Sequence, residues 1–235
     1  YWTVGEWLIS YAGGFVRRGL PGEIVHLISS KYFISPILLI WVVSTFAIIS
    51  LALLLINFCK GFFERSFLLS HLMVLAPISE DYLVRKDAFL VLLYGLSLLS
   101  LKYLNQKKLK KIYCILSVNL FSSIAILSHE SYGIWGLPSL IIIFYLLERR
   151  NKSIFNSSLL AGLYLIPSFI SFILCWAFKG NIDNALIIHQ SWQSLKNILP
   201  TLGSLNQSLP SGAIASIGWG TSQVYMSSLF SQFNL

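Results

Sequence analysis

The run ISPILLIWVVSTFAIISLALLLIN occupies residues 34–57 and decides the fold class of this chain. The hydrocarbon core of a bilayer is about 30 Å thick, and an α-helix needs roughly 20 apolar residues to cross it. The run therefore predicts a transmembrane helix. The whole chain agrees, because 56% of its 235 residues are hydrophobic and only 11% are charged, whereas soluble domains carry about 25% charged residues. We expect an integral membrane protein.

Further apolar runs predict an all-α fold, a polytopic transmembrane helical bundle with about six spans. Two of the runs are short and are interrupted by His71 and by Pro138. The predicted spans are 34–57, 66–79, 88–104, 112–128, 132–147 and 157–178.

Basic residues in short linkers predict the orientation of this bundle. Ten of the 17 Lys and Arg residues lie in the linkers that follow the first, third and fifth predicted spans, when Lys102 at the end of the third span is included, so we expect these linkers to face the cytoplasm. Seven of the nine Asp and Glu residues then fall on the opposite face. That face comprises residues 1–33, 80–87, 129–131 and 179–235. We expect a bacterial inner (plasma) membrane protein whose acidic chemistry is extracytoplasmic.

The same pattern divides the chain into three parts. Residues 1–33 form a long first outer loop, in which 23–33 is an interfacial amphipathic helix with Ile24, Leu27 and Ile28 on one face. Residues 34–178 form the bundle, and 179–235 form an outer tail or loop. Because the chain begins at Tyr1 and ends without a charged tail, we expect a fragment truncated at both ends.

Charge and cysteine content exclude two other readings. The formal net charge is +8, but the positive residues are divided between linkers instead of forming one basic face, so no nucleic-acid partner is expected. Cys59, Cys114 and Cys175 are odd in number and lack metal-ligand spacing, so we interpret them as small packing residues.

Paired residues in the first outer loop favour an anionic ligand. Gly13 and Gly14 permit positive φ and close approach of the backbone to a ligand. Arg17 and Arg18 offer bidentate recognition of phosphate or carboxylate groups. Two roles remain open for this arginine pair, namely anchoring to lipid headgroups and binding of a substrate.

The second outer loop carries five ionisable residues in the eight positions 80–87. A helical turn would pair Asp81 with Arg85, and Asp87 would sit favourably at the start of the next helix. Both are ordinary structural roles. However, Glu80, Arg85 and Lys86 remain crowded at a face where orientation rules disfavour positive charge, which favours a functional site.

Two other outer segments carry polar or aromatic side chains. Adjacent residues point in different directions on a helix, so we expect His129 and Glu130 not to act on each other. They either bind separate groups or cap the membrane interface. The tail with Trp192, Trp219 and Tyr225 is expected to be an irregular loop, and its aromatic faces are compatible with a carbohydrate ligand.

Charged outer loops joined by short basic inner loops give this chain a layout that resembles C-type glycosyltransferases, which use polyprenyl-phosphate sugars. The layout is also similar to that of the membrane polymerases of bacterial surface polysaccharides. The resemblance implies transfer of a sugar from a polyprenyl-linked donor to a glycan or lipid acceptor at the outer face. A loop carboxylate then acts as general base, and cationic side chains stabilise the leaving phosphate.

Carried onto this sequence, the resemblance makes Asp81 or Glu80 the base, with Glu6 and Glu130 as reserves. The cationic candidates for binding the donor phosphate are Arg17, Arg18, Arg85 and Lys86, with His129 assisting. We expect no cofactor. We also expect no tightly bound metal, because the sequence has no DxD motif. A weakly bound divalent cation is the alternative. The rival functions are a lipid-linked-sugar flippase or transporter and a non-catalytic envelope scaffold.

Overall fold

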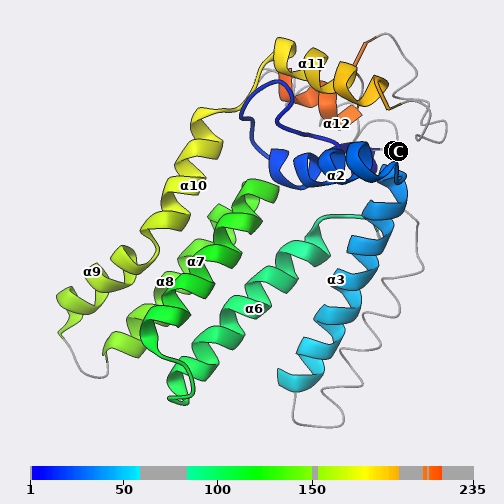
Figure 1. The fold of residues 1–235 in the computed structure, drawn as a ribbon. Coiled ribbons are helices and arrows are strands. Elements are labelled where there is room, and N and C mark those ends of the chain that lie inside the picture. Colours follow the sequence, from blue (N-terminus) through cyan, green and yellow to red (C-terminus); the bar gives the residue numbers. More distant parts are fainter. Residues whose placement is uncertain (1, 59–83, 150–152, 196–208, 211, 219–235) are drawn as a thin grey trace, which may run out of the picture. The chain divides into compact units, whose positions relative to one another are not determined.

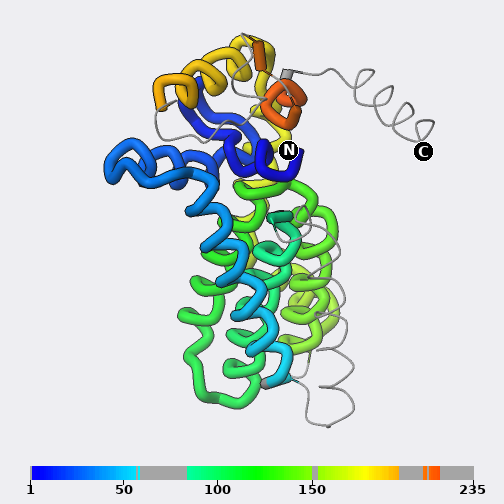
Figure 2. The backbone as a smooth tube through the Cα atoms, turned by 90° about the vertical axis from the view of Figure 1, so that its right-hand side faces the viewer, coloured from blue at the N-terminus to red at the C-terminus, as the bar shows by residue number. Residues whose placement is uncertain are grey.

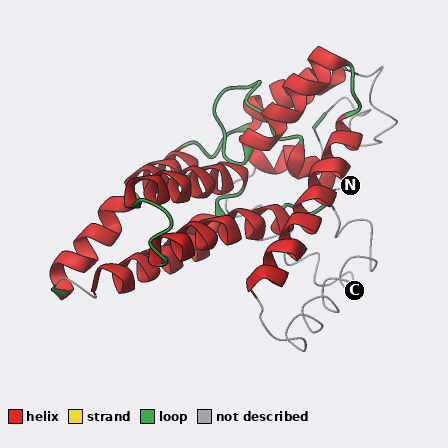
Figure 3. Ribbon diagram, turned by 60° about the horizontal axis from the view of Figure 1, so that its bottom comes forward, coloured by secondary structure: helices red, strands yellow, loops and turns green. Residues whose placement is uncertain are grey.

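The computed structural model describes residues 2–58, 84–149, 153–195, 209–210 and 212–218, apart from the side chain of Asn57. These described residues form helices and connecting loops, with no strand among them (Figure 3). Their contacts divide the chain into two compact units. Unit 1 comprises Tyr1–Ile40 and Phe178–Leu235, and unit 2 comprises Trp41–Ala177.

Unit 2 contains the long apolar helices. Four helices are long and apolar enough to cross a membrane among the described residues, or up to five if one bent pair is a single span. The helices of this part of the chain are α3 (Pro36–Phe58), which begins in unit 1, α6 (Asp87–Asn105), α7 (Lys111–Ser128), α8 (Ser131–Arg149), α9 (Ile154–Tyr164) and α10 (Ile166–Ala177). They confirm the spans predicted at 34–57, 88–104, 112–128 and 132–147, whereas the run 66–79 lies outside the described residues.

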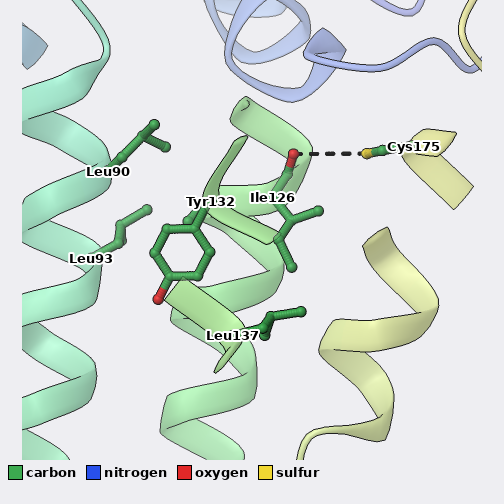
Figure 4. Packing of buried hydrophobic residues seen from close by; sticks show 7 residues of the cluster. Leu90, Leu93, Ile126, Tyr132, Leu137 and Cys175 are labelled. Carbon is green, nitrogen blue, oxygen red and sulfur yellow. Dashed lines mark hydrogen bonds between the residues drawn. The ribbon is translucent and has the colours of Figure 1, made fainter. Parts of the chain in front are cut away.

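Helices α6, α7 and α8 run side by side and share a core (Figures 1 and 2). Figure 4 shows Leu90 and Leu93 of α6 pointing toward the ring of Tyr132 on α8. The Cys175 thiol of α10 donates a hydrogen bond to the carbonyl oxygen of Ile126 on α7 at 3.7 Å. Lipid is as apolar as leucine, so van der Waals packing and interhelical hydrogen bonds hold such helices together.

The last predicted span, 157–178, is not one continuous helix. It consists of α9 and α10, which meet at a bend of 58°. At the bend, Asn119 of α7 occupies the place of a helical hydrogen bond. Its Oδ1 accepts from the backbone N–H of Ser168 at 3.3 Å, and its Nδ2 donates to the carbonyl of Tyr164 at 2.6 Å. Insertion of a side chain between residues i and i+4, next to Pro167, is a recognised cause of helix kinks.

Unit 1 is built from short helices. They are α1 (Trp2–Trp7), α2 (Gly19–Tyr32), α11 (Ile182–Gln193), α12 (Gly212–Ala215) and the 3₁₀ turn η1 (Ser216–Gly218). Helix α2 contains residues 23–32 of the predicted helix 23–33 and starts four residues earlier, and Phe33 is its C-cap. Ile24 and Leu27 are exposed on it, whereas Val25 and Ser29 are buried. An exposed apolar face is what an interfacial helix requires, and its contact with a membrane stays a prediction.

The tail is more regular than expected. Residues 182–193 form α11, so the interpretation of this segment as an irregular loop is wrong. A capping box starts the helix, because Asn181 Oδ1 accepts from the Asn184 backbone N–H at 2.9 Å and Asn184 Oδ1 accepts from that of Asn181 at 2.8 Å. This asparagine spacing is the sequence signal that would have identified the helix. Trp219 and Tyr225 lie outside the described residues.

Trp192 of α11 lies in the core of unit 1. Its side chain is fully buried, and its Nε1–H donates to the carbonyl oxygen of Leu8 at 2.7 Å. The His26 ring of α2 lies edge-on to it, with 4.9 Å between the ring centroids. Trp192 therefore packs inside the protein, and the expectation that it contributes to a sugar-binding surface is wrong.

Candidate functional site

The predicted site residues fall into three groups. Glu80 and Asp81, the first choices for a general base, lie outside the described residues. The second group, in unit 1, consists of Glu6, Arg17 and Arg18. The third group, in unit 2, consists of Arg85, Lys86, His129 and Glu130.

In unit 1, the structure brings Glu6 and Arg18 together. Glu6 lies on α1, and its Oε1 is 3.6 Å from NH1 of Arg18, the residue that immediately precedes α2. Both side chains are about four-fifths buried, with exposed fractions of 19% and 20%. Partial burial reduces solvent screening, so this pair interacts more strongly than an exposed one. The sequence had placed both residues in one loop without indicating that they pair.

The backbone of Arg18 adopts an unusual conformation. Its φ of 65° and ψ of 6° place it in the left-handed region, which costs a non-glycine residue of this kind about 1–2 kcal/mol. Helix α2 starts without a side-chain cap at Arg18. A carboxylate, a guanidinium and a helix N-terminus, which carries partial positive charge, therefore lie close together in this unit.

The loop that carries the arginine pair is fixed by contacts with α11 and the residues before it. Asn184 Nδ2 donates to the Gly13 carbonyl oxygen at 2.6 Å, and the Arg17 backbone N–H donates to that of Phe178 at 3.0 Å. A Cβ on Gly13 would lie 2.9 Å from the Asn184 carbonyl oxygen. The close approach that this glycine permits is thus to the protein's own backbone, and Asn184 is a positioning residue that the sequence did not reveal.

Glu23 has a structural role in the same loop. Its Oε2 accepts a hydrogen bond from the Tyr11 backbone N–H at 2.9 Å. This bond ties the start of the glycine loop to α2. Of the two partly buried carboxylates in unit 1, Glu6 is the one that lies beside a predicted cation.

In unit 2, Arg85 pairs with Asp87. Its Nε lies 2.8 Å from Asp87 Oδ2, and the two side chains are 48% and 63% exposed. Exposed pairs of this kind contribute about 0.2–1 kcal/mol. We predicted a pair between Arg85 and Asp81 instead, and Asp81 lies outside the described residues. Asp87 also begins α6, where a negative charge favours the helix N-terminus.

Lys86 is nearly inaccessible, with an exposed fraction of 2%. Its Nζ donates to the Ser128 carbonyl oxygen at 3.2 Å, at the last residue of α7. A cation at a helix C-terminus is stabilised by the helix dipole and by the carbonyl groups left without intrahelical partners. The structure therefore gives Lys86 the role of joining α6 to the α7–α8 turn, and its binding of phosphate stays a prediction.

His129 and Glu130 lie near each other in the turn that follows α7, and the expectation that they do not act on each other stays a prediction. His129 follows α7 in an extended conformation, with φ −162° and ψ 119°, so helical directions do not apply to it. Its Nδ1 lies 4.0 Å from Glu130 Oε2 and accepts the Ser131 backbone N–H at 3.3 Å. The 4.0 Å separation from the carboxylate is too long for a direct hydrogen bond, whereas Nδ1 is within hydrogen-bond distance of the Ser131 N–H.

A further polar cluster in unit 2 was not predicted. Lys111, the first residue of α7, forms an ion pair with Glu148 in the last turn of α8. The Tyr164 hydroxyl of α9 donates to the same carboxylate oxygen at 3.3 Å, and Lys111 Nζ lies 4.6 Å from the centroid of the Tyr164 ring. The cluster ties three helices together. Among the described residues, no group of three or more His, Cys, Asp or Glu side chains is placed to hold a metal ion.

Comparison with known proteins supports the membrane assignment. No curated protein and no solved structure matches the chain. One family model matches residues 1–201, which include all four long apolar helices of the described chain. This match, together with those helices, establishes an integral membrane protein. The chain belongs to the family described as uncharacterised membrane protein Rv1490.

Proposed function

We propose that this protein is a membrane glycosyltransferase that moves a sugar from a polyprenyl-phosphate donor to a glycan or lipid acceptor at the extracytoplasmic face. The observation that carries the proposal is the partly buried pair of Glu6 and Arg18, 3.6 Å apart, at the uncapped start of α2. A carboxylate next to an anion-binding cation is what such a transfer requires. A backbone outlier maintained at this position, the left-handed Arg18, also fits a functional site.

The proposed reaction assigns one task to each kind of group. The carboxylate takes the proton from the acceptor hydroxyl, and the hydroxyl oxygen forms the new bond to the anomeric carbon of the sugar. The bond between that carbon and the phosphate oxygen breaks, and the polyprenyl phosphate leaves with the electron pair. Arginine binds the leaving phosphate in a bidentate manner, and Arg17 and Arg18 are the candidates in unit 1.

The identity of the general base stays a prediction. Asp81 and Glu80 remain the first choices from the sequence. Among the described carboxylates, Glu6 has the surroundings that suit the role best, because it is partly buried and its neighbour Arg18 orients it. Glu130 is the other reserve, and its carboxylate lies beside His129 Nδ1.

A second candidate function, a lipid-linked-sugar flippase, is favoured by the bend between α9 and α10. Transporters often place their substrate sites at broken helices near the bilayer midplane. However, the Asn119 amide at this bend donates to two carbonyl oxygens, of Ile115 and Tyr164, and accepts from two groups of Ser168. Its hydrogen-bonding capacity is used within the protein, which favours a structural role for the bend.

Transfer assays on the full chain in proteoliposomes test the proposal. The donors are polyprenyl-phosphate hexoses with a radiolabelled sugar, added together with an acceptor glycan. We expect Glu6→Gln or Asp81→Asn to reduce transfer at least about 100-fold, as loss of a general base does. Asp183→Asn is the matched control, because Asp183 is an exposed acid of the same unit as Glu6.

The outcomes separate the three functions. Transfer that survives in both Glu6→Gln and Asp81→Asn contradicts the enzyme assignment for these residues. A flippase would instead move a fluorescent polyprenyl-phosphate lipid between leaflets, and Arg18→Gln would slow that movement with no transfer in the wild type. A scaffold would show neither activity.

A further inference from the structure

A cavity of about 550 Å³ lies between α3 and α6 in unit 2. Its walls are mainly leucine side chains, among them Leu53, Leu96 and Leu99. Leu53 is exposed, so the cavity opens at the surface of the described helices. Both helices are candidate membrane spans. The volume falls within the range of about 300–1,000 Å³ that is typical of ligand sites.

Two contacts define how the cavity is built. Along the helices, Leu54 packs against Gly95, where an added Cβ would lie 2.9 Å from Leu54 Cδ2. At the C-terminal ends, the Lys102 Nζ lies 4.7 Å from the centroid of the Phe58 ring. The two helices therefore run in the same direction. The cavity is lined mainly by apolar side chains along the helices, and Lys102 lies at one end of it.

Lys102 is the charged residue among those that line the cavity. In the described part of the chain, its ammonium group contacts an aromatic ring and has no carboxylate partner. The turn that follows adds Lys107, Lys108 and Lys110. An apolar wall that ends in a cluster of cations is complementary to an acyl chain that ends in a phosphate.

We propose that this cavity binds an anionic phospholipid, with an acyl chain between α3 and α6 and the phosphate at Lys102. The apolar lining favours a lipid over free phosphate, because a soluble anion would use only the end of the cavity. The proposal does not depend on the glycosyltransferase function. It assigns Lys102 and the leucine wall to one ligand.

Native mass spectrometry of the full chain tests the proposal, with the protein purified in mild detergent and exposed to phosphatidylglycerol or phosphatidylcholine. We expect the wild type to retain phosphatidylglycerol preferentially. Lys102→Gln should lower this retention about fivefold, the usual effect of one basic residue near an anionic headgroup. Lys179→Gln, which removes an exposed cation that neither lines the cavity nor belongs to the lysine cluster, should leave retention within about twofold of the wild type.

Two further experiments use the apolar part of the cavity. Leu99→Trp should fill it and prevent retention of both lipids. A photo-crosslinking amino acid at Leu53 in the otherwise wild-type chain should attach to phospholipid. The proposal is overturned if Lys102→Gln retains as much phosphatidylglycerol as the wild type, if Leu99→Trp retains lipid normally, or if the crosslinker attaches only to residues 59–83 of the same chain.

Discussion

Replacing Asn119 by Leu should destabilise the bundle by about 2 kcal/mol. The substitution keeps a similar side-chain volume and removes three hydrogen bonds between α7 and the α9–α10 bend. These bonds join the Asn119 amide to the Tyr164 carbonyl, the Ser168 backbone N–H and the Ser168 hydroxyl. Hydrogen bonds between membrane helices contribute about 0.6 kcal/mol each. The loss would be larger if the two backbone groups stayed unsatisfied, at about 1–3 kcal/mol for each group.

Unfolding by SDS in mixed micelles, followed by tryptophan fluorescence, measures this free energy. Ser117→Ala is the matched control on the same helix, because its hydroxyl donates only to Tyr113 one turn earlier. We expect it to change stability by less than about 0.5 kcal/mol. Ser168→Ala should be intermediate, and its effect should disappear in the Asn119→Leu background. A change of less than about 0.5 kcal/mol for Asn119→Leu would refute the structural role assigned to the amide.

Two further predictions concern the two units separately. Gly22→Ala should unfold unit 1, because the added Cβ would overlap the Ile9 carbonyl oxygen. Limited proteolysis would detect this loss of structure. Gly162→Ala should instead stabilise α9 by about 0.5–1 kcal/mol, because its Cβ would meet open space. Lys86→Met should destabilise unit 2 by about 1–3 kcal/mol, because it removes a buried hydrogen bond from a charged group. Asp87→Asn weakens an exposed ion pair and should cost less than about 1 kcal/mol. The same SDS titration measures both variants. Equal losses of stability in Lys86→Met and Asp87→Asn would contradict the expectation that the buried Lys86 hydrogen bond contributes more than the exposed Arg85–Asp87 pair.

The candidate site was only partly predictable from the sequence. Charge density in short segments drew attention to Arg18 and Lys86, but it could not supply their partners. Arg18 pairs with Glu6 because the glycine loop returns α2 to α1. Lys86 bonds to a carbonyl 42 residues away, which no local pattern indicates. The helical conformation assumed for His129 was wrong, because this residue is extended and its Nδ1 lies 4.0 Å from Glu130 Oε2.

The sequence by itself determined that this is a membrane protein and where α3, α6, α7 and α8 lie. The bilayer is an external constraint of fixed thickness, so the length of an apolar run is sufficient to identify a span. Only the tertiary structure decided that the last span bends and that Asn119 holds the bend. Hydropathy is a local property, whereas the hydrogen bonds from Asn119 to Tyr164 and Ser168 join residues 45 and 49 positions apart. Such partners are chosen by packing, because a backbone group freed inside a membrane must find a polar group on a neighbouring helix.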